Sequence, residues 1–217
     1  MEVDFSVSGQ HYLFNVQTFA HTVLALGGDG YRYALRDRTT QGVIDDVAGG
    51  VSELGVVFET SETADALNEA FAAAGLEFVQ LKESSPRVAL PASHPLVNAA
   101  SLSLDVLSDY PYVYFDQGED APESFYEEAL GAAPRAKSIA TTDRASLSEL
   151  IVALNGYTVT SGILVGVSDG AGLNTVPLET DVKLYLGYVK RAGEPLGMIG
   201  RRYVETLQKN LEKYVRF

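Results

Sequence analysis

The feature that most constrains the fold is a regular alternation of strand and helix patterns over the first 81 residues. Short apolar or alternating runs are separated by segments whose apolar residues recur every three or four positions. This alternation favours parallel strands covered by helices, which is an α/β lobe. The expected strands are 3–7, 31–35, 54–58 and 76–81. In the first expected helix, which opens at 8–10, one apolar stripe should face the core: Tyr12, Val16, Phe19, Val23 and Leu26.

The second half of the chain repeats this pattern after a polar boundary at 82–86. The expected strands of this half are 87–91, 112–115, 136–140, 157–160, 174–178 and 182–189. Three helices are expected: one at 122–130, one capped by Thr142 or Asp143, and a C-terminal one after Pro195. The last strand is long enough to return the chain to the first lobe. The predicted fold class is α/β, with two Rossmann-like lobes joined by two crossover strands. Lobe I is 1–82 plus 184–217, lobe II is 83–183, and a ligand cleft lies between them.

Composition narrows the possible functions. The formal net charge is −13, and the 16 basic residues are scattered, so this chain alone is not expected to bind nucleic acid. It has no cysteine, hence no disulfide and no Cys-based metal site. Neither a signal-peptide pattern nor an apolar run of membrane-spanning length is found, which favours a cytoplasmic protein without membrane contact.

The signatures of common enzymes are also absent. The sequence has no phosphate-binding loop, no dinucleotide-binding glycine motif and no metal-ligand spacing among its three histidines. The stretch 166–170 fits the G-x-S-x-G pattern of hydrolases, but no histidine follows it, and we interpret it as a surface turn. Adjacent carboxylates such as Glu127 and Glu128 are interpreted as solvated. We expect no catalytic residues, no metal and no cofactor.

Several short motifs, in order and over about 200 residues, carry a family resemblance. The chain resembles the effector-binding domain of LysR-type transcriptional regulators, and the motifs are 5–8 (FSVS), 50–57 (GVSELGVV), 92–96 (ASHPL), 104–107 (LDVL) and 150–159 (LIVALNGYTV). The sequence departs from the family pattern at Glu53 and at Thr160–Ser161. The resemblance implies a fold of the periplasmic-binding-protein type II and a small-molecule effector between the lobes. The family's winged helix-turn-helix is expected to be missing from this chain.

The resemblance also implies which residues contact the effector. By position these are Ser8, Gln10 and Thr39 from the first lobe, and Gln117, Thr142 and Thr160 from the second. The hydroxyls of Ser8, Thr39 and Thr142 are expected at helix N-termini, where free N–H groups attract anions, so a small anionic metabolite is favoured. The alternative for each is a simple helix cap. His11 and Tyr12 are candidates for the cleft mouth, with a core position as the alternative for Tyr12.

The expected partners follow from the same resemblance. They are the effector and a second copy of the chain, in a homodimer or homotetramer in which the helix at about 40–47 meets a second-lobe helix of the partner. DNA would be bound only through the absent N-terminal domain. The rival function is that of a solute-binding protein in a transport system with a similar two-lobed fold. The sequence leaves open the effector's identity, the target genes, and whether the regulator activates or represses.

Overall fold

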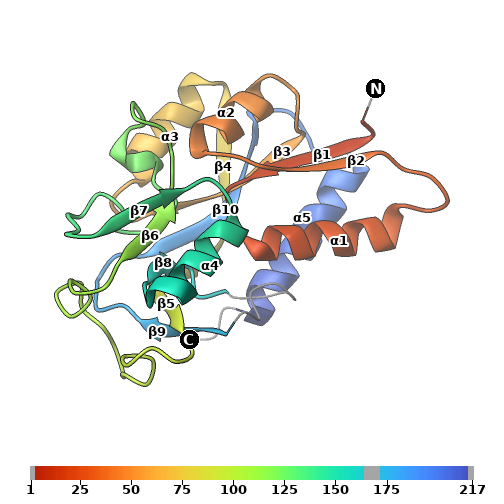
Figure 1. The fold of residues 1–217 in the computed structure, drawn as a ribbon. Helices are drawn as coiled ribbons and strands as arrows, with labels where there is room; N and C mark the ends of the chain where they lie inside the picture. The colour runs from red at the N-terminus through yellow and green to blue at the C-terminus, as the bar shows by residue number, and fades with distance from the viewer. Residues whose placement is uncertain (1–2, 164–171, 215–217) are drawn as a thin grey trace.

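In the computed structural model, which describes residues 3–163 and 172–214, the first lobe is built on a five-stranded sheet (Figure 1). The strand order is β2-β1-β3-β10-β4. Strand β1 is parallel to β2 and β3, whereas β10 is antiparallel to both β3 and β4. The strands are β1 (Phe5–Gly9), β2 (Tyr33–Asp37), β3 (Leu54–Thr60), β4 (Leu76–Ser84) and β10 (Leu184–Arg191).

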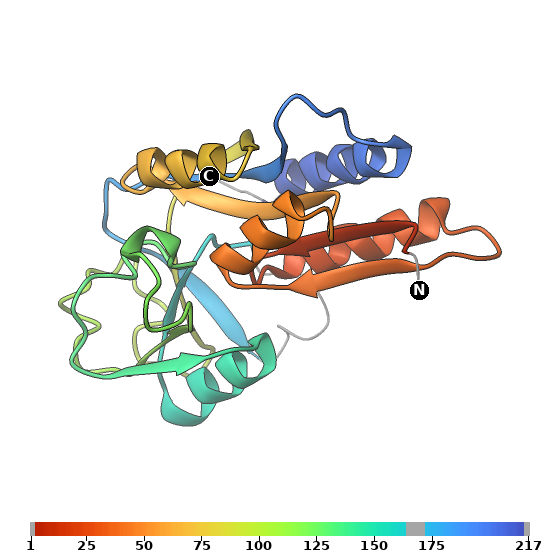
Figure 2. The ribbon, with the colours of Figure 1, turned by 90° about the horizontal axis from the view of Figure 1, so that it is seen from above.

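Helices cover both faces of this sheet because β3 is apolar on both sides. Val57 packs with residues of α2 and α3, while its neighbour Val56 packs with residues of α1 and α5. Figures 1 and 2 show how these helices are arranged around the sheet. A strand buried on both faces is typical of α/β lobes. The helices are α1 (Leu13–Leu26), α2 (Thr40–Ala48), α3 (Ala64–Ala73) and α5 (Met198–Tyr214).

The second lobe contains two smaller sheets. In one, β5 is the central strand and pairs antiparallel with β8 and β9; in the other, β6 pairs parallel with β7. A single bridge between Tyr112 and Tyr157 connects the two. The elements are β5 (Arg87–Pro91), β6 (Tyr112–Phe115), the 3-10 turn η1 (Glu123–Phe125), β7 (Ser138–Thr141), α4 (Arg144–Leu154), β8 (Thr158–Thr160) and β9 (Leu173–Pro177).

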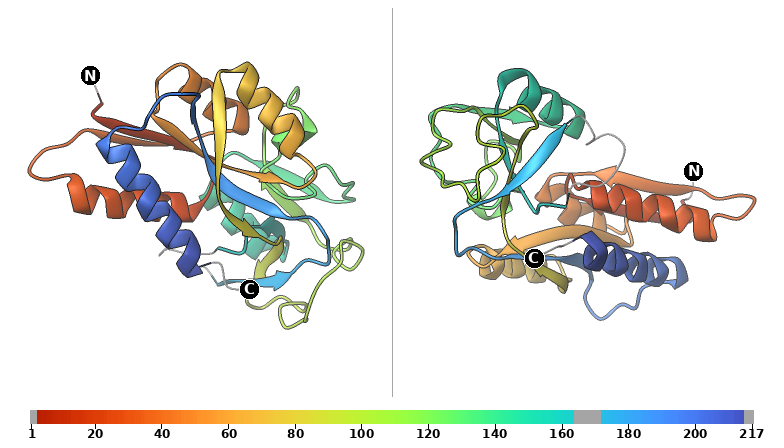
Figure 3. Two further views of the ribbon diagram at one scale, coloured as in Figure 1. Left: turned by 180° about the vertical axis from the view of Figure 1, so that it is seen from behind. Right: turned by 90° about the horizontal axis from the view of Figure 1, so that it is seen from below.

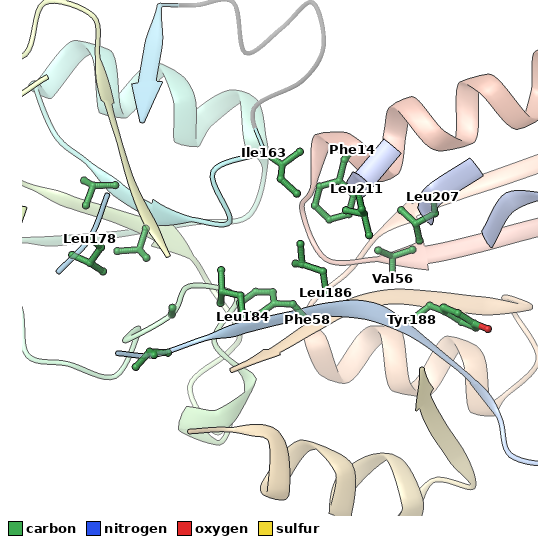
Figure 4. Packing of buried hydrophobic residues seen from close by; sticks show 14 of the residues in the cluster. Phe14, Val56, Phe58, Ile163, Leu178, Leu184, Leu186, Tyr188, Leu207 and Leu211 are labelled. Carbon is green, nitrogen blue, oxygen red and sulfur yellow. The ribbon is translucent and has the colours of Figure 1, made fainter. Parts of the chain in front are cut away.

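The chain passes twice between the lobes, from β4 into β5 and from β9 into β10 (Figures 2 and 3). The predicted two-lobed α/β fold is therefore confirmed, and the 182–189 strand does return to the first sheet. The lobe boundaries at 82–83 and 183–184 stay predictions. One apolar cluster runs through both lobes, and Figure 4 shows it extending from Leu178 past Leu184 and Phe58 to Leu207.

The expected apolar stripe on the first helix is confirmed only in part, because Tyr12 and Phe19 pack against the core but a different face of the helix is the most deeply buried. The most deeply buried face of α1 carries Phe14, Asn15, Thr18 and Thr22, whereas the predicted residues are only partly buried. The polar members of this face contact α5. The Tyr203 hydroxyl donates to Asn15, and the Asn210 side-chain nitrogen donates to Thr18 Oγ1 at 2.9 Å. These bonds compensate for burying polar groups, which a hydrophobicity pattern does not register.

The expected helix at 122–130 is also wrong. Only the 3-10 turn η1 forms, and Leu130 adopts a left-handed backbone conformation with φ of 58°. The reason lies in Glu127 and Glu128, which turn inward and make tertiary hydrogen bonds. The first helix likewise begins later than expected, at Leu13, because Gln10 extends the β1 ladder by donating its N–H to the carbonyl of Val56 at 3.1 Å.

Glu53 and His94, which lie in two of the sequence motifs, each accept a hydrogen bond from the backbone. Glu53, a departure from the family pattern, accepts a hydrogen bond from the Gly197 N–H at 2.5 Å and so fixes the approach to α5. His94 is buried, and its Nδ1 accepts from the Leu96 N–H at 3.1 Å within the turn that follows β5. The G-x-S-x-G match at 166–170 lies outside the described residues.

Candidate functional site: a cavity between the lobes

A cavity of about 80 Å³ lies where the two lobes meet. Both lobes supply its walls: the start of α1 from the first, and β5, β8, α4 and the segment around 127–128 from the second. Most of the lining is apolar, with polar groups at a few positions, as is usual for small-molecule sites. The lining residues are His11, Tyr12, Leu13, Ala89, Phe115, Glu127, Glu128, Arg144, Leu147, Ser148, Thr158, Val159, Thr160, Ile163 and Leu173.

At one wall of the cavity, Glu127 of the second lobe is bound by donors from both lobes. Its carboxylate accepts from the His11 N–H at 2.8 Å, from His11 Nδ1 at 2.9 Å and from Gln117 Nε2 at 2.8 Å. The His11 ring also stacks on Phe115, with centroids 4.2 Å apart. Charge-assisted bonds of this kind are stronger than neutral ones, so His11 and Glu127 form a firm connection between the lobes.

The charge state of His11 reflects this environment. Burial alone would lower the pKa of the imidazole, because it disfavours the charged form. The hydrogen bond from His11 to Glu127 and the negative charge of Glu127 outweigh burial, and the pKa of His11 is raised above its ordinary value. The side chains are only 6% exposed for His11 and 2% for Glu127, so solvent screens the pair weakly.

Further polar contacts between the lobes surround this pair. The Gln117 side-chain oxygen accepts from the Thr40 N–H at 2.8 Å, and the Thr40 hydroxyl donates to the carbonyl of Phe125 at 2.7 Å. Arg144 of α4 also pairs with Asp37 at the end of β2, at 2.9 Å. The lobes are thus held together by polar groups around a small cavity, and a change in lobe angle would have to break these bonds.

Glu128 stands apart from this network. It is 4% exposed, one oxygen accepts from the Phe115 N–H at 2.9 Å, and the other oxygen, Oε2, has no hydrogen-bond partner within the described part of the chain. Burial and then the nearby charge of Glu127 raise the pKa of Glu128 well above its ordinary value. The interpretation of Glu127 and Glu128 as a solvated pair is therefore wrong, since both turn into the contact between the lobes.

Of the six residues expected to contact the effector, all of which the structure describes, Thr160 lines the cavity. Gln117 lies next to it, bonded to Glu127. Gln10 is buried and bridges Thr40 and the Phe58 N–H. The others lie elsewhere: Ser8 is fully buried against Asp46 and Ser52, Thr39 caps α2 through the Gly42 N–H, and Thr142 is exposed beside Asp143, which caps α4. Their roles in binding stay predictions.

Sequence reasoning missed Glu127, Glu128, Arg144 and Thr158 as site residues. His11 and Tyr12, the candidates for the cleft mouth, both line the cavity, and Tyr12 also packs against the apolar core, which was its alternative. The Tyr12 hydroxyl donates to the carbonyl of Glu127 at 3.0 Å. An adjacent pair of glutamates within an otherwise apolar stretch was the available signal. It was read as solvated because a helix was expected there.

The described residues offer no group of three or more His, Asp or Glu side chains placed to hold a metal ion. Within residues 3–163 and 172–214, no helix combines the length and apolarity that crossing a membrane requires. What the site offers a ligand is therefore the apolar and polar side chains of the cavity wall.

Known proteins match this chain in fold but not in sequence family. No family model matches the sequence, and no curated protein matches it either. Solved structures do match in fold. The effector-binding domain of QuiR, in complex with shikimate, is 11% identical, with a TM-score of 0.63 and coverage of 98% of both chains. The OxyR regulatory domain from Pseudomonas aeruginosa, in reduced form, is 14% identical, with a TM-score of 0.66 and coverage of 94% of this chain and 96% of that one.

Longer regulators match over part of their length. The OxyR C206 mutant from Corynebacterium glutamicum is 16% identical, with a TM-score of 0.68, and the match covers 97% of this chain but 64% of that one. At these identities the likeness shows the fold. The chain thus has the two-lobed, periplasmic-binding-protein-like fold seen in the effector-binding domains of LysR-type regulators.

Proposed function

We propose that this chain is the effector-binding domain of a LysR-type regulator, and that it senses a small molecule in the cavity between its lobes. The observation that carries the proposal is the position of the cavity. His11, Glu127 and Arg144 line the cavity and also make the bonds that join the lobes. A ligand that alters these contacts would bind one lobe arrangement better than another, and this differential affinity is what shifts a conformational equilibrium.

The remaining steps of the proposal are supported only by the likeness in fold to effector-binding domains of LysR-type regulators. In the intact regulator, DNA would be bound by a separate helix-turn-helix domain, and two or four copies would associate through the effector domain. The protein would act in the cytoplasm, as a regulator of transcription must. Within this proposal the cavity binds its ligand without transforming it, and its lining provides hydrogen bonds and apolar contacts.

A ligand screen by thermal unfolding tests this function. Carboxylates, amines and neutral metabolites should be compared, because the sequence favours an anion. A ligand at about 100 times its Kd should raise Tm by about 5–10 °C, since it stabilises only the folded state. Ser148→Phe, which fills the cavity from α4, should abolish the shift, whereas Glu149→Phe at the neighbouring exposed position should keep it. A shift that Ser148→Phe leaves intact would place the ligand elsewhere.

A further inference from the structure

The charges around the cavity differ from those that an anion site needs. Two cationic side chains line it, and each already has an anionic partner: His11 lies 2.9 Å from Glu127, and Arg144 lies 2.9 Å from Asp37. Glu128 remains without a cationic partner within the described residues. An incoming carboxylate would have to displace Glu127 from His11 or Asp37 from Arg144, because both cationic side chains of the lining are already paired.

Two polar atoms at this cavity have no hydrogen-bond partner among residues 3–163 and 172–214. One is Oε2 of Glu128, and the other is the hydroxyl oxygen of Thr158 on β8. Both residues line the cavity, and they are only 4% and 7% exposed. Buried polar groups are almost always hydrogen-bonded in proteins, so an unpartnered pair at one cavity points to a ligand that supplies the missing partners.

The rest of the lining determines which non-polar group of the ligand fits beside the polar atoms. Aliphatic side chains from several elements and the aromatic rings of Tyr12 and Phe115 form the apolar part of the wall. Such a surface favours a short hydrocarbon or aromatic group, which gains free energy by leaving water. The apolar lining comprises Leu13, Ala89, Phe115, Leu147, Val159, Ile163 and Leu173.

We propose that the effector is a small cation, an amine or amidine with a short apolar or aromatic body, whose N–H groups donate to Glu128 and Thr158. The inference rests on the proposed function and replaces the anionic class expected from the sequence. An ammonium group satisfies both unpartnered acceptors and supplies the positive charge that Glu128 lacks. Hydrogen bonds to charged groups contribute more than neutral ones, so Glu128 is the main determinant of specificity.

This assignment has a consequence for protons. In the empty cavity, burial holds the pKa of Glu128 well above its ordinary value and favours the neutral acid. A bound cation favours the carboxylate instead, so Glu128 releases a proton to the buffer as the ligand enters. The pKa of Glu128 is therefore higher without the ligand than with it. At a pH between these two values, titration calorimetry in two buffers with different ionisation enthalpies should give different apparent binding enthalpies.

The test uses three probes of nearly the same shape on the whole chain: benzylamine, benzyl alcohol and benzoate. Benzylamine should raise Tm most and benzoate least. Glu128→Gln keeps the side-chain volume but removes the charge, and it should weaken benzylamine binding about tenfold to a hundredfold, as expected for a charge-assisted bond. Glu149→Gln, on the exposed face of α4, should bind like the wild type. Circular dichroism checks that each variant is folded.

Every result decides between alternatives. Binding of benzoate in preference to benzylamine would overturn the cationic class while leaving the proposed sensing function intact. Binding of benzylamine that Glu128→Gln does not weaken would overturn the role of Glu128. If neither these probes nor n-butylamine and butyrate change Tm, both proposals lose support. Should Glu128→Gln fail to fold, Thr158→Val replaces it, since it removes the second acceptor at nearly constant volume and should also weaken benzylamine binding.

Discussion

At the scale of single residues, His11 is the side chain on which the contact between the lobes most depends. It supplies two of the three donors to Glu127, one from the backbone and one from the ring. It also stacks on Phe115, so its orientation is fixed on both sides. An imidazole held in this way responds to pH close to neutrality, because its ordinary pKa lies near 6.5.

The raised pKa of His11 predicts how stability changes with pH. A group whose pKa is higher in the folded state stabilises the fold below its unfolded pKa of 6.5, and this stabilisation is lost as the pH rises through the higher folded value. Glu127→Gln should lower the His11 pKa, followed by NMR titration of the imidazole, and should flatten the fall in unfolding free energy above pH 6.5. Glu123→Gln serves as the control. An unchanged His11 titration in Glu127→Gln would contradict the assignment.

At the scale of elements, the contact between α1 and α5 shows why helix faces are hard to assign from apolar spacing. The contact combines the Tyr203–Asn15 and Asn210–Thr18 pairs with apolar neighbours such as Phe14 and Leu207. The sequence-based stripe follows the apolar residues only. The structure instead buries amide and hydroxyl groups that satisfy one another across the two helices.

This polar contact predicts a specific pattern of stability. Tyr203→Phe removes the only hydrogen bond that the structure gives to Asn15 Oδ1 among the described residues, and it should lower the unfolding free energy by about 1–3 kcal/mol. Asn15→Leu should have a comparable cost because the tyrosine hydroxyl loses its acceptor. The double variant should cost less than the sum of the two, measured by urea unfolding. Strict additivity would show that the two side chains do not interact.

At the scale of the whole molecule, the lobes form one continuous apolar core but meet through polar side chains at the cavity. The apolar part anchors the strands that pass between the lobes, as Figure 4 shows around Leu184 and Leu178. The polar part lies in the contacts of Glu127, Thr40 and Arg144. Two lobes that are joined by two chain crossings and otherwise held by breakable polar bonds are suited to hinge motion.

Loss of the bonds to Glu127 should therefore open the lobes. In Glu127→Ala the two donors of His11 and the Gln117 amide lose their common acceptor. We expect a larger radius of gyration in small-angle X-ray scattering, together with a lower Tm. Glu123→Ala, on the 3-10 turn of the same segment, should scatter like the wild type. Equal scattering curves for Glu127→Ala and the wild type would mean that the remaining contacts suffice to hold the lobes.

The amino-acid pattern was enough to predict the two-lobed α/β fold, because strands and helices are separated by clear periodicities and turns. Strand β5 at Arg87–Pro91 and strand β6 at Tyr112–Phe115 fall where the sequence places them. The motifs also predicted the family whose effector domains share the fold. Local patterning specifies these features since each depends on residues close together in the chain.

The site was decided by the tertiary structure. Whether Glu127 and Glu128 face water or the lobe contact depends on their hydrogen-bond partners. His11 is 116 residues from Glu127 in the sequence, and Phe115 is 13 residues from Glu128. The same holds for Thr158, whose hydroxyl is left unpartnered only when β8 is buried beside the cavity. Charge pairing and burial arise between segments that meet only on folding, so no reading of local spacing could have found them.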